Sequence, residues 1–255
     1  MTSRFEPTDS LVGRTAVITG GTGAIGLASA QRLAKLGARC VLLYNSESPA
    51  SAAAKAAALP GSGHLSFQAS ITDSAALKAV AEQVAAQCGV VHILINSAGY
   101  TKAVPAADLD ALSDELIDDI LKVNFRGVMA TIRAFMPLLK QSEDGLIVNI
   151  SSIAGFTGTG SNLAYVAAKA SIDVVGDALA KAFAPYVRVI SVSPGVVDST
   201  FVPGRGTDFN DKVAPTIPLR RIGTVDDVAA VVQACATTMR YVTGTRIVVD
   251  GGRHL

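Results

Sequence analysis

The 255-residue sequence has few cysteines, little net charge and no long apolar run. Its three cysteines are odd in number and far apart, which predicts reduced thiols in a cytosolic protein rather than a disulfide framework. The 22 basic and 21 acidic residues give a formal net charge of +1 without a basic cluster. We therefore expect neither nucleic acid nor a membrane as a partner.

The three histidines, His64, His92 and His254, show no metal-ligand spacing, so no metal site is predicted. No stretch approaches the roughly 20 apolar residues of a membrane span, and the opening MTSRFEPTDS lacks the apolar core of a signal peptide. These absences predict a soluble, cytoplasmic protein.

Strands and helices alternate along the chain. Apolar, β-branched runs predict strands at residues 14–19, 39–44, 64–69, 91–95, 145–150, 188–192 and 246–249. Helices are predicted at residues 24–36, 49–59, 73–88, 113–140, 161–181 and 224–239, the fourth with a break near Asn124 or Gly127. This alternation predicts an α/β fold: a single-domain, Rossmann-type doubly wound parallel sheet of about seven strands, with helices on both faces. Residues 1–10 are expected to form a polar tail and residues 11–255 the domain.

A glycine-rich loop, GGTGAIG, spans Gly20–Gly26 between the first strand and the first helix. Glycines permit a sharp turn that brings backbone amides close to a phosphate, and the helix N-terminus adds free N–H donors. The loop is therefore a candidate site for a dinucleotide pyrophosphate. A tight turn that binds nothing has the same sequence pattern.

The second strand ends in Tyr44, Asn45 and Ser46, where a dinucleotide fold would meet the adenosine ribose. An acidic side chain near this point accepts hydrogen bonds from the 2′-hydroxyl in NAD-binding proteins. Small polar residues in its place favour NADP(H) over NAD(H). However, no Arg or Lys follows to pair with a 2′-phosphate, and Glu47 is close enough to reach a hydroxyl, so NAD(H) stays open.

Tyr165 and Lys169 lie four residues apart on the predicted helix 161–181, so that their side chains leave the same face one turn apart. A phenol has a reference pKa of about 10, and a neighbouring cation lowers that pKa towards neutrality. The pair is a candidate for acid/base catalysis. The alternative is a half-buried aromatic ring beside a solvated cation, which contributes nothing to chemistry.

An irregular stretch rich in Pro, Gly, Phe and Thr follows the sixth strand, at residues 198–220. It would lie over the carboxyl edge of the sheet, and Gly204 and Gly206 would let it move, so we interpret it as a substrate lid. A plain surface excursion is the alternative interpretation.

Taken together, these segments resemble the classical short-chain dehydrogenases/reductases, in a 3-oxoacyl reductase-like form, from about Leu11 to Gly252. The matching positions occur in the order of the family: Thr19-Gly20 and Gly26, Asn96-Ser97-Ala98-Gly99, Asn124, Ser152, Tyr165 with Lys169, Pro194-Gly195, and Val249-Asp250-Gly251-Gly252. The chain departs from the common pattern at Ala24 in the loop, at Ser97, at Ser70 near the adenine, and at Ser199 or Thr200 near the nicotinamide carboxamide.

The resemblance implies a role for each matching residue. Tyr165 would donate the proton in reduction or remove it in oxidation, Lys169 would lower the pKa of Tyr165 and hold the nicotinamide ribose, and Ser152 would bind the substrate oxygen. Asn124 would position a water that connects Lys169 to solvent. The residues implied to contact the dinucleotide are Gly20, Thr22, Gly23, Ala24, Ile25, Gly26, Tyr44, Asn45, Ser46, Ser70, Ile71, Asn96, Ala98, Gly99, Tyr165, Lys169, Pro194, Gly195, Val197 and Ser199.

The family resemblance also implies an activity and an assembly. We expect an NAD(P)(H)-dependent oxidoreductase that interconverts a ketone and a secondary alcohol, with NADPH-dependent reduction of a 3-oxoacyl or similar carbonyl substrate as the first hypothesis. An NAD-dependent sugar, polyol or other alcohol dehydrogenase is the alternative, and a non-catalytic dinucleotide sensor is a second one. A homotetramer that packs through the long helices around Asn124 and Tyr165 is expected.

Overall fold

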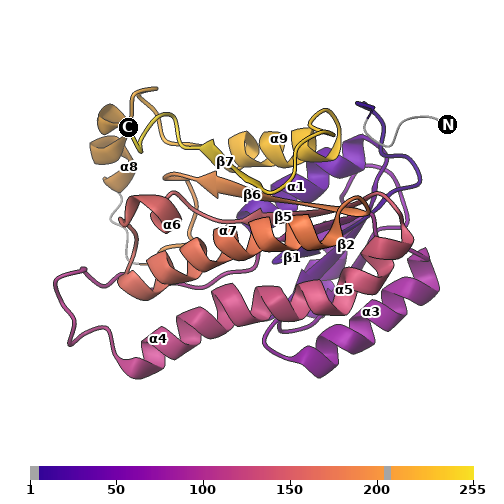
Figure 1. Ribbon diagram of the computed structural model, residues 1–255, viewed down its shortest axis with the longest axis horizontal. Coiled ribbons are helices and arrows are strands. Elements are labelled where there is room, and N and C mark those ends of the chain that lie inside the picture. The colour runs from indigo at the N-terminus through magenta and orange to yellow at the C-terminus, as the bar shows by residue number, and fades with distance from the viewer. Residues whose placement is uncertain (1–5, 204–207) are drawn as a thin grey trace.

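Seven parallel strands form one sheet in a computed structural model that describes residues 6–203 and 208–255 (Figure 1). The strands are β1 (Thr15–Thr19), β2 (Arg39–Tyr44), β3 (Leu65–Gln68), β4 (Ile93–Asn96), β5 (Gly145–Ile150), β6 (Val187–Pro194) and β7 (Thr245–Val249). Their order in the sheet is β3-β2-β1-β4-β5-β6-β7. The predicted doubly wound, Rossmann-type sheet is thus confirmed.

Helices cover both faces of this sheet. They are α1 (Ala24–Lys35), α2 (Pro49–Ala57), α3 (Ser74–Cys88), α4 (Asp114–Leu121), α5 (Val128–Gln141), α6 (Ala154–Thr157), α7 (Leu163–Phe183), α8 (Phe209–Val213) and α9 (Val225–Ala236). In Figure 1, α1 and α9 lie on one side of the sheet, whereas α3, α5 and α7 lie on the other. The short helices α6 and α8 were not predicted, because neither is long enough to show a helical period.

Side chains at the helix starts explain several boundaries. The Asp73 carboxylate accepts hydrogen bonds from Ala75 N and Ala76 N, and so begins α3. Asn162 begins α7 by accepting from Tyr165 N at 2.7 Å. Such caps satisfy amides that have no partner within the helix. The Asn162 cap thereby fixes the turn of α7 from which the Tyr165 side chain projects.

Consecutive strand residues pack into opposite cores, because side chains alternate across a strand. Ile18 of β1 belongs to the core under α1, α2 and α9, which contains Leu33 and Val232. Its neighbour Val17 belongs to the core under α3, α5 and α7, which contains Phe135. Burial on both faces accounts for the continuously apolar strands that the sequence displays.

The chain reverses its direction of winding between β1 and β4, and the two strands pair in register from Ala16–Ile93 to Thr19–Asn96. The Thr19 hydroxyl accepts hydrogen bonds from Ser97 N at 3.1 Å and Ala98 N at 3.2 Å. This hydroxyl holds together the two loops that leave the adjacent strands. In doubly wound sheets, ligands bind in the crevice outside the carboxyl strand ends at this switch point.

A π-helical segment, η1 (Lys122–Gly127), joins α4 to α5 where the sequence predicted a break. Asn124 in this segment is fully buried, and its Nδ2 donates to the carbonyl oxygens of Tyr100 at 2.7 Å and Ile120 at 3.0 Å. The helix continues through the segment with a wider turn instead of ending. Turns of this kind often mark functional positions.

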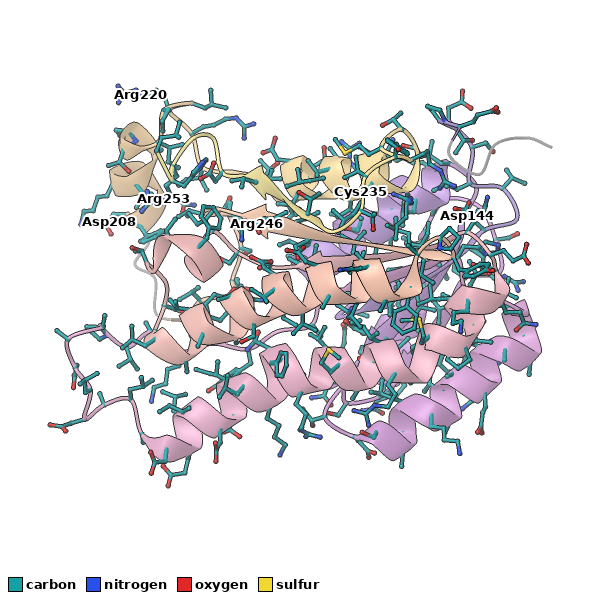
Figure 2. The ribbon with its side chains drawn as sticks, in the orientation of Figure 1. Asp144, Asp208, Arg220, Cys235, Arg246 and Arg253 are labelled. Carbon is teal, nitrogen blue, oxygen red and sulfur yellow. The ribbon has the colours of Figure 1, made fainter. Side chains whose placement is uncertain are left out.

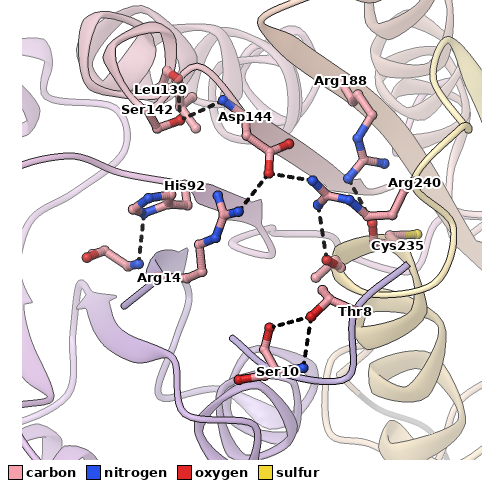
Figure 3. Close-up of polar contacts among 12 residues, drawn as sticks. Thr8, Ser10, Arg14, His92, Leu139, Ser142, Asp144, Arg188, Cys235 and Arg240 are labelled. Carbon is pink, nitrogen blue, oxygen red and sulfur yellow. Dashed lines mark hydrogen bonds and ion pairs between the residues drawn. The ribbon is translucent and has the colours of Figure 1, made fainter. Parts of the chain in front are cut away.

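Charged side chains gather at the amino edge of the sheet, away from the switch point (Figure 3). Asp144 pairs with Arg14 at 2.9 Å and with Arg240. Arg188 donates to the carbonyl oxygens of Cys235 and Met239 at the end of α9. Backbone carbonyls satisfy both terminal nitrogens of the buried Arg188 guanidinium, whereas its Nε has no hydrogen-bond partner among the described residues. This cluster anchors the edge of the fold that lies opposite the ligand crevice.

The sequence predicted neither a membrane span nor a metal site, and both features can be looked for in the structure. No helix in the described part of the chain is both long and apolar enough to cross a membrane. Within those same residues, no group of three or more His, Cys, Asp or Glu side chains is arranged to hold a metal ion.

Candidate functional site

A cavity of about 1420 Å³ opens along the carboxyl edge of the sheet. Nineteen residues predicted for the site contribute to its wall: Gly20, Thr22, Gly23, Ala24, Ile25, Tyr44, Asn45, Ser46, Ser70, Ile71, Ala98, Gly99, Ser152, Tyr165, Lys169, Pro194, Gly195, Val197 and Ser199. The wall therefore joins segments that follow β1, β2, β3, β4, β5 and β6. The three other predicted residues, Gly26, Asn96 and Asn124, are not part of the wall.

Those three residues support the wall from behind. A Cβ atom on Gly26 would lie 2.2 Å from the carbonyl oxygen of Gly20, so α1 can approach the loop only with glycine at this position. Asn96 is buried and donates to Asn149 Oδ1 at 2.9 Å. Asn124 Oδ1 accepts from Tyr100 N at 3.4 Å and would lie 3.0 Å from a Cβ atom at Gly99, so a larger residue there would crowd it. Asn124 thus shapes the loop that follows β4.

The glycine loop presents an open helix N-terminus to the cavity. Gly20 has a φ of 61°, and a Cβ there would lie 3.0 Å from the backbone of Ala98. Gly23 caps α1 without any side-chain hydrogen bond. Amides in the first turn of such a helix lack partners within it and attract anions. The loop therefore presents to the cavity a helix N-terminus at which an anion can bind.

Tyr165 and Lys169 share one face of α7, as the sequence predicted. Both side chains are buried, and Lys169 Nζ lies 5.4 Å from the centroid of the Tyr165 ring. Lys169 Nζ also donates to the carbonyl oxygen of Ile150 at 2.8 Å, which holds the ammonium at the end of β5. Burial lowers the pKa of Lys169 to about 8, partly opposed by Asp173 one turn further along α7. The ammonium is therefore close enough to stabilise negative charge on the phenol.

The hydroxyls of the two serines after β5 differ in the hydrogen bonds that they make. The Ser151 hydroxyl donates to the carbonyl oxygen of Lys169 at 3.4 Å and is buried. The Ser152 hydroxyl accepts from Ala154 N at 3.1 Å. Among the described residues, no acceptor takes the hydrogen of the Ser152 hydroxyl. Ser152 is thus the serine that can donate to an oxygen in the cavity.

An ion pair stands where the adenosine ribose was predicted, and sequence reasoning missed its cation. Lys55 Nζ lies 2.7 Å from Glu47 Oε1 and donates to the carbonyl oxygen of Thr22 at 3.0 Å. Ser51 also donates to Glu47. The ammonium of Lys55 and the hydroxyls of Ser51 and Thr22 lower the pKa of Glu47 to about 2. Ser51 and Lys55 share one face of α2, whereas Glu47 precedes the N-cap Ser48, so helical spacing alone did not reveal this ion pair.

Apolar side chains from the predicted lid line the other end of the cavity. Phe201, Val202 and Phe209 contribute to the wall, and the Phe201 ring lies 6.1 Å from that of Tyr165. The expected hinge residues Gly204 and Gly206 lie outside the described part of the chain. Within it, Ser199–Val202, Phe209 and Thr216 line the cavity that also contains the candidate catalytic side chains.

Known proteins share both the sequence and the fold of this chain. A family model described as "Enoyl-(Acyl carrier protein) reductase" matches residues 21–254. The chain is 35% identical over 252 residues to the "Granaticin polyketide synthase putative ketoacyl reductase 2" of Streptomyces violaceoruber, covering 97% of this chain and 99% of that protein. It is 30% identical over 245 residues to the "3-oxoacyl-[acyl-carrier-protein] reductase FabG" of Escherichia coli K12, covering 95% and 98%.

A solved structure has the same architecture. The "Short-chain dehydrogenase/reductase SDR:Glucose/ribitol dehydrogenase" of Brucella melitensis superimposes with a TM-score of 0.90 at 27% identity, covering 98% of this chain and all of that one.

Proposed function

The chain belongs to the short-chain dehydrogenases/reductases and is an oxidoreductase that acts on a carbonyl or alcohol group; within this activity, we propose that it reduces a 3-oxoacyl or similar ketone with NADPH. The placement of Tyr165, Lys169 and Ser152 on the wall of one cavity carries the proposal. Two relatives named as ketoacyl or 3-oxoacyl reductases support the substrate class.

The glycine loop fits a nicotinamide dinucleotide. The close contact between Gly26 and Gly20 and the open N-terminus of α1 form a cradle for a pyrophosphate. The residues from Tyr44 to Ser46 would hold the adenosine half of the dinucleotide. Pro194, Gly195, Val197 and Ser199 would hold the nicotinamide half, beside Lys169.

In the proposed reaction, Tyr165 and Ser152 act on the carbonyl oxygen of the substrate, and Lys169 acts on Tyr165. A reduced nicotinamide supplies a hydride to the carbonyl carbon when the cofactor is bound. Tyr165 gives its proton to the oxygen, so that the C=O π bond is replaced by new C–H and O–H bonds. Lys169 stabilises the phenolate that remains, and Ser152 donates a hydrogen bond to the oxygen as charge develops on it. Asn124 supports the neighbouring loop, and we propose that it also holds a water on the path that returns a proton.

The experiment that tests this function replaces the phenol. Tyr165→Phe removes the proton donor and should lower kcat for ketone reduction by about 10²-fold or more, with little change in the Kd for NADPH. Tyr241→Phe is the matched control, since Tyr241 is 90% exposed. Full activity of Tyr165→Phe would refute the assignment. Cofactor binding by the wild type without turnover of any ketone or polyol would instead indicate the non-catalytic sensor.

Lys55 supports the preference for NADPH. It supplies the cation that the sequence appeared to lack, and it already neutralises Glu47, the carboxylate that would otherwise repel a 2′-phosphate. Lys55→Ala should weaken NADPH binding by about tenfold while leaving NADH binding within about twofold. Glu47→Gln should preserve or strengthen NADPH binding. Tighter binding of NADH than NADPH by the wild type would favour the alternative, NAD-dependent polyol oxidation.

Two further features of the predicted enzyme remain proposals. Residues 198–220 would cover the substrate, which the apolar lining from Phe201 and Phe209 supports. A homotetramer would form through the long helices α5 and α7. A cavity of about 640 Å³ between them supports this assembly, because its lining is mainly apolar: Met129, Ile132, Met136, Pro137, Leu179 and Phe183, with Arg133 and Lys140.

A further inference from the structure

The C-terminal residues form a polar wall at the substrate end of the cavity. Arg253 and His254 both contribute to the lining. They follow β7, whereas the Glu47–Lys55 pair follows β2, five strand spacings away along the sheet. At ~4.8 Å per strand, the two ends are about 24 Å apart. Arg253 therefore lies at the opposite end of the cavity from the adenosine site.

Ionic and aromatic contacts hold this C-terminal segment in place. The Asp250 carboxylate, 3% exposed, accepts from His254 N and contacts His254 Nδ1, both at 2.8 Å. The His254 ring packs edge-on against Phe156 of α6 with a centroid distance of 5.6 Å. Arg246 covers Phe156 at 4.4 Å. Because α6 begins two residues after Ser152, these contacts place the segment beside the candidate catalytic residues.

The guanidinium of Arg253 has a neutral hydrogen-bond partner but no ion pair with any described residue. Its Nη1 donates to the Thr216 hydroxyl at 3.1 Å, and the side chain is half-buried. Among the described residues, no carboxylate pairs with Arg253. Those residues that line the cavity include a single carboxylate, Glu47, at the far end. Figure 2 shows Arg253 at the end of the molecule that carries α6 and α8.

A half-buried arginine without a counter-ion is a strong receptor for an anion, since its planar donors match the oxygens of carboxylates and phosphates. We propose that Arg253 binds an anionic group of the carbonyl substrate, a carboxylate or a phosphoester, and thereby selects charged ketones over neutral ones. The identity of the ligand as a reducible ketone rests on the proposed function, whereas the binding of an anion by Arg253 does not. The anion would replace the neutral Thr216 hydroxyl as the partner of Arg253.

Binding of two matched ligand pairs tests the inference without any need for turnover. Calorimetry compares 4′-phosphopantetheine with pantetheine, and 3-oxobutanoate with its ethyl ester, on the full chain. The wild type should bind at least one anionic member about tenfold more tightly than its neutral partner. Arg253→Ala should abolish that preference, Arg253→Lys should restore part of it, and Lys78→Ala, which changes an exposed lysine of α3, should not alter it. The pair that responds identifies the anion.

Two results would overturn the inference. Equal binding of charged and neutral ligands by the wild type would show that Arg253 does not select charge. An equal loss for both members of a pair in Arg253→Ala would show that Arg253 merely ties Thr216 to the C-terminal segment. Reduction of ethyl 3-oxobutanoate, measured separately, tests the proposed function, so that the failure of one is distinguishable from the failure of the other.

Discussion

Arg246 Nη1 lies 3.1 Å from Asp173 Oδ2, which joins the last strand of the sheet to the helix that carries Tyr165 and Lys169. The Asp173 side chain is 5% exposed, and it stands one turn after Lys169. The pair therefore fixes α7 against β7 and also acts on the ammonium of Lys169. A change at Asp173 should be detectable in both stability and titration.

Asp173→Asn should lower the free energy of unfolding by about 1–3 kcal/mol, because Arg246 loses the charge of its partner. It should also lower the pKa of Lys169 below about 8, since Asp173 opposes the effect of burial. Urea unfolding and a pH–rate profile measure the two effects. Glu82→Gln, at an exposed position of α3, is the control. Unchanged stability would show that the pair contributes nothing.

Gly26→Ala should disrupt the dinucleotide loop. The new Cβ would lie 2.2 Å from a backbone oxygen, so the loop or α1 must shift, at a cost of about 1–3 kcal/mol. We expect cofactor affinity to fall about tenfold or more, measured by fluorescence titration. Gly176→Ala is the matched control: its nearest neighbour would be 3.6 Å away, and alanine should stabilise α7 by up to about 1 kcal/mol. Wild-type affinity in Gly26→Ala would contradict the role of the loop.

The buried ammonium of Lys169 should make stability depend on pH. Burial lowers the pKa of Lys169 to about 8 in the folded protein, from the ordinary lysine value of 10.5. Between these values the unfolded chain binds more protons, so this group's contribution to stability rises with pH. Lys169→Met should therefore be more stable than the wild type below pH 8, and the difference should shrink by up to about 3 kcal/mol by pH 10.5. A constant difference in thermal or urea unfolding across this range would argue against the lowered pKa.

The rate of reduction should decline as pH rises through about 8, because the Lys169 ammonium loses its proton there. The decline should appear in the pH profile of kcat/KM, because that profile reports the pKa values of the free enzyme. An unchanged rate up to pH 10 would mean that the charge of Lys169 is not needed for the reaction.

Met129→Lys should break the proposed tetramer, since it adds a third cation beside Arg133 and Lys140 in the cavity between α5 and α7. Light scattering after gel filtration should show a smaller species than the wild type. Ala79→Lys, on an exposed position of α3, introduces the same side chain elsewhere and should leave the mass unaltered. A monomeric wild type would rule out the assembly.

The order of strands and helices was predictable because each element carries its own local signal. The β1 run, the glycine loop and the α1 pattern follow one another without ambiguity, and parallel pairing then brings the carboxyl ends to one edge. The same reasoning placed Tyr165 and Lys169 on one helical face. Sequence patterns thus predict the contacts that lie within one helix or strand, or along the shared carboxyl edge of the sheet.

The remaining contacts depend on tertiary packing. Lys55 lies in an alanine-rich helix, and only the fold brings it to the carbonyl oxygen of Thr22, 33 residues away. Arg253 sits near the chain terminus, where periodicity carries no information. The sequence located an interruption near Asn124 but not its π-helical form, in which the Asn124 side chain bonds to the carbonyl oxygens of Tyr100 and Ile120.

The separation of the Glu47–Lys55 pair from Arg253 has a consequence for altering the enzyme. Residues that far apart and without shared partners contribute additively to binding energies. Coenzyme preference can thus be altered at one end of the cavity, and the preference for charged or neutral ketones at the other. Substitutions selected separately for each purpose should keep their effects when they are combined in one chain.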